Sequence, residues 1–261
     1  MLGAMEDGDR LDEHARRARD WVRASRPPIC DVITPWEHGT VVRSSEFPDY
    51  YEYNHVRVES DPAMNADELI AVADEALAGL SHRRLDFEVL EAGERVRAEF
   101  VQRGWITSRL LWMRHRTPPP AVPGPEVAEV PYGAVAHLRI AWHSEDHPDE
   151  TGHSAFKAQA REVSIRRGGR VLAVPGEERP AGFAELVSDG SSAEISQVYV
   201  EPRRRRAGLG TALTVAAIRL AGQPRDLWIC ADDEDRPKEM YARLGFRGVW
   251  RSMTFEHSPA A

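Results

Sequence analysis

Residues 193–213 combine groups that could bind an anion. They read AEISQVYVEPRRRRAGLGTAL, in which β-branched and aromatic residues precede Pro202, four arginines, two glycines and an apolar pattern with helical spacing. Gly208 and Gly210 have no Cβ, so backbone N–H groups at the start of the helix could converge on an anion. Arg205 and Arg206 would add countercharge. The order of residues predicts a phosphate-binding loop between a strand and a helix.

Two other interpretations of this loop are possible. A pair of glycines after a strand can be an ordinary entry into a helix, and an arginine run can be a nucleic-acid-binding patch or a localisation signal. The formal net charge of the chain is −8, which disfavours a nucleic-acid partner. The loop also lacks the Gly-Lys-Ser/Thr of a Walker loop and the spacing of a dinucleotide fingerprint. We therefore expect no nucleic-acid partner.

The loop resembles a known family motif. Residues 205–210 read R-x-x-G-x-G, and with VYVEP before them they resemble the acyl-CoA pyrophosphate loop of the GNAT superfamily of N-acyltransferases. The resemblance implies acetyl-CoA as the acyl donor. It implies donor contacts from Val198, Tyr199, Val200, Arg205, Arg206, Ala207, Gly208, Leu209, Gly210 and Thr211.

A second signature lies in residues 235–246, DRPKEMYARLGF. Pro237 suits a first helical turn, Asp235 can cap it, and Gly245 suits the position after the helix. The ending Y-x-x-L-G-F resembles the fourth helix of the GNAT family, whose tyrosine commonly protonates the departing CoA thiolate. The resemblance implies this catalytic role for Tyr241. Many family members have Asn seven residues before that tyrosine, where this chain has Glu234.

Two carboxylates are candidates for the base that deprotonates an amine. Glu194 begins the strand before the loop, where several family members place such a carboxylate, often acting through water. Two-residue alternation puts Glu194 on one face with Ser196 and Val198 and puts Gln197 on the other, unless a bulge intervenes. Glu194 is the predicted catalytic base, with a solvent-facing strand carboxylate as the alternative. Glu185, on the preceding strand, is the fallback base and a predicted acceptor-binding residue.

A polar segment, AWHSEDHPDE, contains His143, Asp146 and His147. These residue types can bind a metal, but no cysteine or second cluster completes a site, so a polar loop is the preferred interpretation and no metal is expected. The loop between the first two GNAT helices usually borders the acceptor pocket. The resemblance therefore implies that His143 and Asp146 contact the acceptor.

The elements expected around these residues follow the GNAT order. In the second half, EVAEV is a predicted strand, residues 134–142 and 155–164 are predicted helices, and residues 170–174 and 180–187 are a predicted hairpin before the signature strand. In the first half, helices are predicted over 10–24, 66–80 and 93–103. Strands are predicted within 29–58 and over 85–89 and 108–114.

The two halves show an internal repeat. Val56 to Val58 match Val198 to Val200, and 27 positions separate Val58 from Leu85 and Val200 from Leu227. Any alternating α/β chain could show similar spacings. Phe100 falls one residue beyond the position that corresponds to Tyr241, and it has no hydroxyl. Residues 59–69 contain neither glycine nor arginine. The first half therefore resembles a degenerate GNAT domain, kept for packing or acceptor binding.

The fold expected is α/β: two GNAT-like domains in tandem, each a mixed, mostly antiparallel sheet flanked by helices. Residues 117–125, TPPPAVPGP, contain five prolines and one glycine and indicate a linker. We expect a degenerate GNAT-like domain over 1–117, a Pro-rich linker over 118–126 and a catalytic GNAT domain over 127–261.

Composition narrows the class of protein. The chain has 261 residues, of which 42% are hydrophobic, enough for two cores. Two cysteines give no disulfide framework, and no signal peptide or membrane-spanning run is visible, so a cytoplasmic monomer or homodimer without a membrane partner is expected. The predicted function is N-acetyl transfer from acetyl-CoA to a primary amine of a small molecule. The alternatives are a non-catalytic CoA-binding or scaffold protein and a protein N-acetyltransferase.

Overall fold

The chain forms two compact units, and each of them is built from more than one segment of the sequence. The computed structural model describes residues 2–118, 121, 124–146, 154–176 and 178–258. The first unit comprises Met1–Trp112, Ala231–Asp235 and Gly248–Ala261, and the second comprises Met113–Cys230 and Arg236–Arg247. The domain division at residues 118–126 stays a prediction about independent folding. The compact units themselves are discontinuous in sequence.

The first unit contains a six-stranded arrangement with the order β1-β2-β3-β4-β11-β5. β3 and β4 are parallel, whereas β1 with β2, β2 with β3, and β4 with β11 are antiparallel. Its elements are α1 (Leu2–Ala24), β1 (Val32–Trp36), β2 (Gly39–Arg43), the short 3-10 helix η1 (Tyr51–Tyr53), β3 (His55–Val58), α2 (Ala66–Ala76), β4 (Arg83–Phe87), α3 (Leu90–Gln102), β5 (Ile106–His115) and β11 (Phe246–His257).

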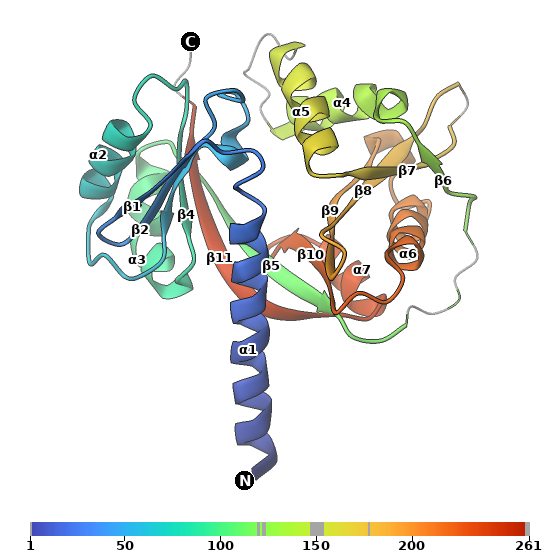
Figure 1. Cartoon of the computed structure of the whole chain (residues 1–261), viewed down its shortest axis with the longest axis horizontal. Helices are drawn as coiled ribbons and strands as arrows, with labels where there is room; N and C mark the ends of the chain where they lie inside the picture. Colours follow the sequence, from blue (N-terminus) through green and yellow to red (C-terminus); the bar gives the residue numbers. More distant parts are fainter. Residues whose placement is uncertain (1, 119–120, 122–123, 147–153, 177, 259–261) are drawn as a thin grey trace. The chain divides into compact units, whose positions relative to one another are not determined.

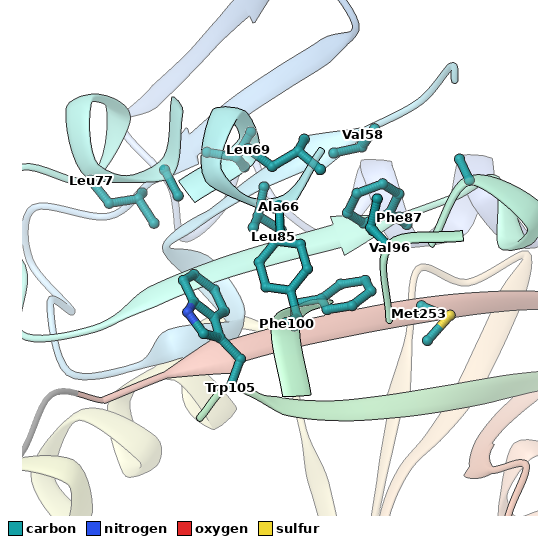
Figure 2. Packing of buried hydrophobic residues seen from close by; sticks show 14 residues of the cluster. Val58, Ala66, Leu69, Leu77, Leu85, Phe87, Val96, Phe100, Trp105 and Met253 are labelled. Atoms are coloured by element: carbon teal, nitrogen blue, oxygen red, sulfur yellow. The ribbon is translucent and has the colours of Figure 1, made fainter. Parts of the chain in front are cut away.

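The core of this unit lies between the sheet and helices α2 and α3 (Figure 2). Val56 and Val58 alternate with polar residues on β3, so they share the face that α2 and α3 cover. Met253 and Phe255 of β11 are fully buried in the same cluster. The sequence predicts no strand after Phe246, whereas the structure contains β11 there.

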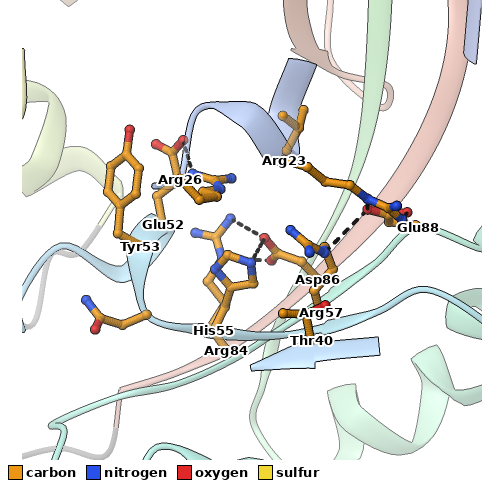
Figure 3. Close-up of polar contacts among 12 residues, drawn as sticks. Arg23, Arg26, Thr40, Glu52, Tyr53, His55, Arg57, Arg84, Asp86 and Glu88 are labelled. Atoms are coloured by element: carbon orange, nitrogen blue, oxygen red, sulfur yellow. Dashed lines mark hydrogen bonds and ion pairs between the residues drawn. The ribbon is translucent and has the colours of Figure 1, made fainter. Parts of the chain in front are cut away.

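The opposite face of β3 and β4 holds buried and half-buried polar side chains (Figure 3). Arg84 Nε lies 2.8 Å from Asp86 Oδ1, and His55 Nε2 lies 3.7 Å from Asp86 Oδ2. Arg57 Nε lies 3.6 Å from Glu88 Oε1. Pairing of opposite charges offsets the cost of removing them from water.

The second unit has the strand order β10-β9-β8-β7-β6. Figure 1 shows α4 and α5 on one face of its sheet and α6 on the other. Its elements are β6 (Ala128–Val130), η2 (Tyr132–Val135), α4 (Ala136–Asp146), α5 (Ser154–Arg166), β7 (Arg170–Val174), β8 (Gly182–Ser188), β9 (Ser192–Val200), η3 (Pro202–Arg204), α6 (Leu209–Ala221), β10 (Asp226–Asp232) and α7 (Pro237–Arg243). The predicted mixed α/β fold is confirmed, and the elements predicted for the second half occur in the predicted order.

Candidate active site

The predicted phosphate loop joins β9 to α6. Arg206 has φ +67° and Gly208 has φ +80°, which turns the chain so that α6 begins at Leu209. Within the described residues, the backbone N–H groups of residues 206–211 donate no hydrogen bond, whereas that of Ala212 donates to the Gly208 oxygen. Six free donors at the positive end of a helix are suited to bind an anion.

The two arginines predicted as countercharge differ in their surroundings. Arg205 Nε donates to the Val200 oxygen at 3.0 Å, and its Nη2 donates to Glu145 Oε2 at 2.6 Å. Glu145 also accepts a hydrogen bond from the Tyr199 hydroxyl. Burial, and then the bond to Glu145, raise the pKa of Tyr199, so the phenol stays protonated. Arg206 forms no side-chain hydrogen bond or ion pair with a described residue, so its guanidinium is available to an anion.

β9, which precedes the loop, separates from β10, which follows α6. β9 and β10 pair in parallel from Ser192 to Ile195 and from Asp226 to Ile229. β9 continues to Val200, and no pairing with β10 is present over these last five described residues. Backbone groups near Val198 are therefore available on that side to bind an extended ligand.

The corresponding strands of the first unit stay together. β3 and β4 pair through Val58 and Phe87, the last residues of both strands. The Glu88 N–H then donates to the Val58 oxygen at 2.9 Å. The first unit therefore lacks the separation that is found between β9 and β10. It also lacks the glycines and arginines that form the loop in the second unit. This supports the interpretation of the first half as degenerate.

A β-bulge decides which side chains of β9 share a face. Glu185 pairs with Gln197 and Leu186 pairs with Ile195, so Ser196 is the extra residue. Because of this bulge, Glu194 shares its face with Gln197 and Glu185. The alternation expected for an unbroken strand, with Gln197 on the other face from Glu194, is wrong for that reason.

The two candidate bases differ in their environments. Glu194 is 8% exposed, and its Oε2 accepts a hydrogen bond from Arg167 Nη2 at 3.0 Å. Glu185 is 3% exposed, and its carboxylate has no hydrogen bond or ion pair with a described residue. One carboxylate is thus compensated by an arginine, and the other is not.

Tyr241 lies on α7, next to the loop. Sδ of the preceding Met240 lies 3.6 Å from the position that a Cβ on Gly210 would take, which puts α7 beside the first turn of α6. Tyr241 is 5% exposed, and its hydroxyl has no hydrogen bond with a described residue. Burial and the nearby Cys230 raise the pKa of Tyr241, so it remains a proton donor at neutral pH.

The other residues that are predicted to contact the acceptor, His143 and Asp146, lie toward the end of α4. His143 is buried, and Asp146 is exposed. His147 lies outside the described residues. Among the residues that the structure describes, no three or more His, Cys, Asp or Glu side chains are grouped in a way that could hold a metal ion. The roles of His143 and Asp146 toward the acceptor stay predictions.

Two polar residues near these groups are not predicted from the sequence. They are Ser164 and Arg167. One signal could have indicated them: the Gly168-Gly169 pair before β7, which suggests a crowded turn. Their partners are distant in sequence, so local patterns do not identify their contacts.

None of the helices in the described part of the chain has the length and apolar character needed to cross a membrane.

No curated protein matches the sequence. The first solved structure among the matches is a functionally unknown conserved protein from Staphylococcus epidermidis, with 14% identity, a TM-score of 0.62, and coverage of 88% of this chain and 94% of that chain.

Two other solved structures have lower scores. A tandem GNAT protein from the clavulanic acid biosynthesis pathway has 18% identity, a TM-score of 0.48, and coverage of 77% of this chain and 74% of that chain. A GCN5-related N-acetyltransferase from Sphaerobacter thermophilus has 14% identity, a TM-score of 0.47, and coverage of 75% and 66%.

A family model matches part of the sequence. Residues 134–246 match the Acetyltransferase (GNAT) family, and this span includes α4, the strands β7 to β10, the anion loop and Tyr241. The chain therefore contains a GNAT acetyltransferase domain at residues 134–246.

Proposed function

We propose that the chain is an N-acetyltransferase that moves an acetyl group from acetyl-CoA to a primary amine of a small molecule, by direct attack in a ternary complex. The observation that carries this proposal is the row of six free N–H donors at residues 206–211, next to two strands that separate. The donors suit a pyrophosphate, and the separated strands suit an extended pantetheine arm.

The residues of the second unit have distinct roles in the proposed reaction. The loop amides and Arg206 hold the pyrophosphate, and backbone groups near Val198 hold the thioester carbonyl. A carboxylate on the face shared by Glu194 and Glu185 takes a proton from the amine. Tyr241, which is buried and protonated, gives a proton to the departing thiolate.

The donor site is tested with a matched pair of variants at Gly208. Gly208→Asp places a negative charge against the pyrophosphate, whereas Gly208→Asn has the same size and tolerates the positive φ without the charge. We expect calorimetry to show loss of acetyl-CoA binding in Gly208→Asp and only a modest weakening in Gly208→Asn. Equal binding by the two variants would refute the proposed donor site.

Activity is tested by release of free CoA thiol with a broad panel of amines that includes peptides with lysine and free N-termini. Turnover with small amines supports the proposal. Turnover with peptides alone would make the chain a protein N-acetyltransferase. Binding of acetyl-CoA at the loop without turnover of any amine would instead favour the non-catalytic CoA-binding alternative.

A further inference from the structure

Two side-chain oxygens, Glu185 Oε1 and Ser164 Oγ, lie close to Gly169, which is between α5 and β7. The Gly169 N–H donates to the Ser164 carbonyl at 2.8 Å. A Cβ built on Gly169 would lie 2.2 Å from Glu185 Oε1 and 2.6 Å from Ser164 Oγ. Both oxygens therefore occupy the space where any other residue would place its side chain. Only glycine permits this arrangement.

The residues that carry these oxygens are buried. Glu185 is 3% exposed and Ser164 is 4% exposed. Neither the carboxylate of Glu185 nor the hydroxyl of Ser164 forms a hydrogen bond or ion pair with a described residue. A carboxylate in a buried residue, without a counterion among the described residues, is suited to bind a cationic group.

A third unpartnered acceptor lies opposite Glu185. Gln197 pairs with Glu185 across β8 and β9, so the two side chains share a face and their Cβ atoms are neighbours. Gln197 Oε1 is buried without a hydrogen bond to a described residue. Gln197 also lies just beyond Ile195, where β9 leaves β10, and next to Val198. The group of acceptors therefore adjoins the strand segment proposed to hold the thioester.

We propose that Glu185, Gln197 and Ser164 bind the reacting group of the acceptor as a primary ammonium, and that Glu185 takes its proton. This proposal rests on the proposed function and names the chemistry of its second substrate. A primary ammonium has three N–H donors for three acceptors, whereas a secondary ammonium has two and a tertiary ammonium has one. Glu185 supplies the opposite charge.

Glu194 has a different role from Glu185 in this proposal. Glu194 lies on the same face of the sheet, but its carboxylate forms an ion pair with Arg167 at 3.0 Å. Glu185 has no counterion among the described residues. It pairs with Gln197, which follows the bulge, whereas Glu194 precedes the bulge. We therefore assign direct contact with the amine to Glu185, and to the Glu194–Arg167 pair the support of the neighbouring strand and helix.

The proposed reaction balances in protons and bonds. One proton passes from the ammonium to Glu185, which frees a lone pair. The nitrogen then bonds to the thioester carbon while the carbon–sulfur bond breaks. Tyr241 protonates the thiolate and regains a proton from the acylated nitrogen. The products are the amide, free CoA thiol and one proton, which Glu185 releases to solvent.

The experiment uses the full chain and a panel of simple amines, each beside its N-methyl and N,N-dimethyl homologue. We expect wild-type turnover with primary amines and at least about tenfold lower kcat/KM with N-methyl homologues, because one hydrogen bond to the ammonium is lost. Equal turnover of both series would overturn the proposal. Turnover of none would overturn it together with the proposed function.

Variants separate binding from proton transfer. Gln197→Leu should raise KM for the amine about tenfold with a smaller change in kcat, whereas Glu185→Gln should lower kcat/KM by about a hundredfold or more. Acetyl-CoA affinity should change in neither. Glu162→Gln on the exposed side of α5 is the matched control and should behave as wild type.

The two proposals fail in distinguishable ways. If Glu185→Gln and Gln197→Leu keep wild-type kinetics while Gly208→Asp still abolishes donor binding, the ammonium site is wrong and the donor site stands. If Glu194→Gln loses turnover and Glu185→Gln does not, the base is Glu194 and the assignment to Glu185 is wrong.

Discussion

Tyr241 combines deep burial with a hydroxyl that has no partner among the described residues. If it protonates the thiolate, Tyr241→Phe should lower kcat by about a hundredfold, since general acids contribute factors of this order. Acetyl-CoA affinity should stay within about twofold of wild type, because phenylalanine fills the same space. Steady-state kinetics together with calorimetry check both values. Unchanged kcat would show that the thiolate obtains its proton elsewhere.

The raised pKa of Tyr241 also predicts a pH dependence. Burial and the nearby Cys230 favour the neutral phenol, so its pKa in the folded chain exceeds the usual value of about 10. The acid form should therefore persist past that pH, and kcat should show no decline from its ionisation up to about pH 10. A descending limb near pH 9 that disappears in Tyr241→Phe would contradict this environment.

Gly169 tests the placement of Glu185 without changing its charge. In Gly169→Ala the new methyl group would lie 2.2 Å from Glu185 Oε1, so the carboxylate must move. We expect kcat/KM for the amine to fall about tenfold with acetyl-CoA affinity unchanged, because hydrogen-bonded positioning is worth this much. Gly133→Ala is the matched control, since nothing lies within 4 Å of the Cβ position there. Full activity of Gly169→Ala would show that the position of Glu185 is unimportant.

At the scale of elements, the charged face of β3 and β4 predicts acid sensitivity. Burial, together with the nearby Arg26, Arg84 and Arg57, lowers the pKa of His55 to about 3, although Asp86 acts in the opposite direction. An unfolded histidine has a pKa of about 6.5. Between these values the unfolded chain binds a proton that the folded chain does not, so the contribution of His55 to stability is present above pH 6.5 and is lost as the pH falls toward 3.

The measurement is urea unfolding of wild type and His55→Gln at several pH values. The stability of wild type should decrease more steeply than that of the variant between pH 6.5 and 4, by a few kcal/mol in total. His38→Gln, at a side chain that is 21% exposed, is the control and should keep the wild-type slope. Identical slopes for wild type and His55→Gln would mean that His55 titrates normally in the folded chain.

At the scale of the whole chain, β11 makes the first unit depend on the C-terminal sequence. Phe255 lies with its ring centroid 5.1 Å from that of Phe87 and 4.5 Å from that of Phe100, and Met253 pairs with Phe87 across β11 and β4. A fragment of residues 1–117 lacks these side chains and the strand partner of β4. Each lost apolar side chain costs about 2 kcal/mol of burial, which is large against the stability of a small domain.

We therefore expect fragment 1–117 to be unfolded or insoluble when it is expressed alone. Coexpression with fragment 118–261 should restore a soluble complex, and the full chain cut at an inserted protease site after Thr117 should stay associated. Circular dichroism and size-exclusion chromatography measure these outcomes. A stably folded fragment 1–117 would support the division into domains at residues 118–126 as independent folding units.

The sequence by itself determined the features whose residues are contiguous. The loop from Val198 to Thr211 needs only a strand end, a run of arginines, and glycines before a helix, so its conformation and its chemistry are both local. The same holds for α7 with Tyr241, and for the alternation of elements in the second half. The absence of glycine and arginine after Val58 indicated a degenerate first half for the same reason.

Only the tertiary structure decided the pairings between distant residues. A single extra residue, Ser196, moved Gln197 to the face of Glu194 and Glu185, and the alternation of residue types does not reveal a bulge. The ion pair of Glu194 with Arg167 joins residues 27 positions apart. The place of β11 beside β4 follows from burial of Met253 and Phe255 in a core whose other residues lie between Val56 and Trp105. Strand register and long-range burial are properties of the packed chain, so local patterns predict the loop, whereas packing decides which polar side chains share a face of the sheet.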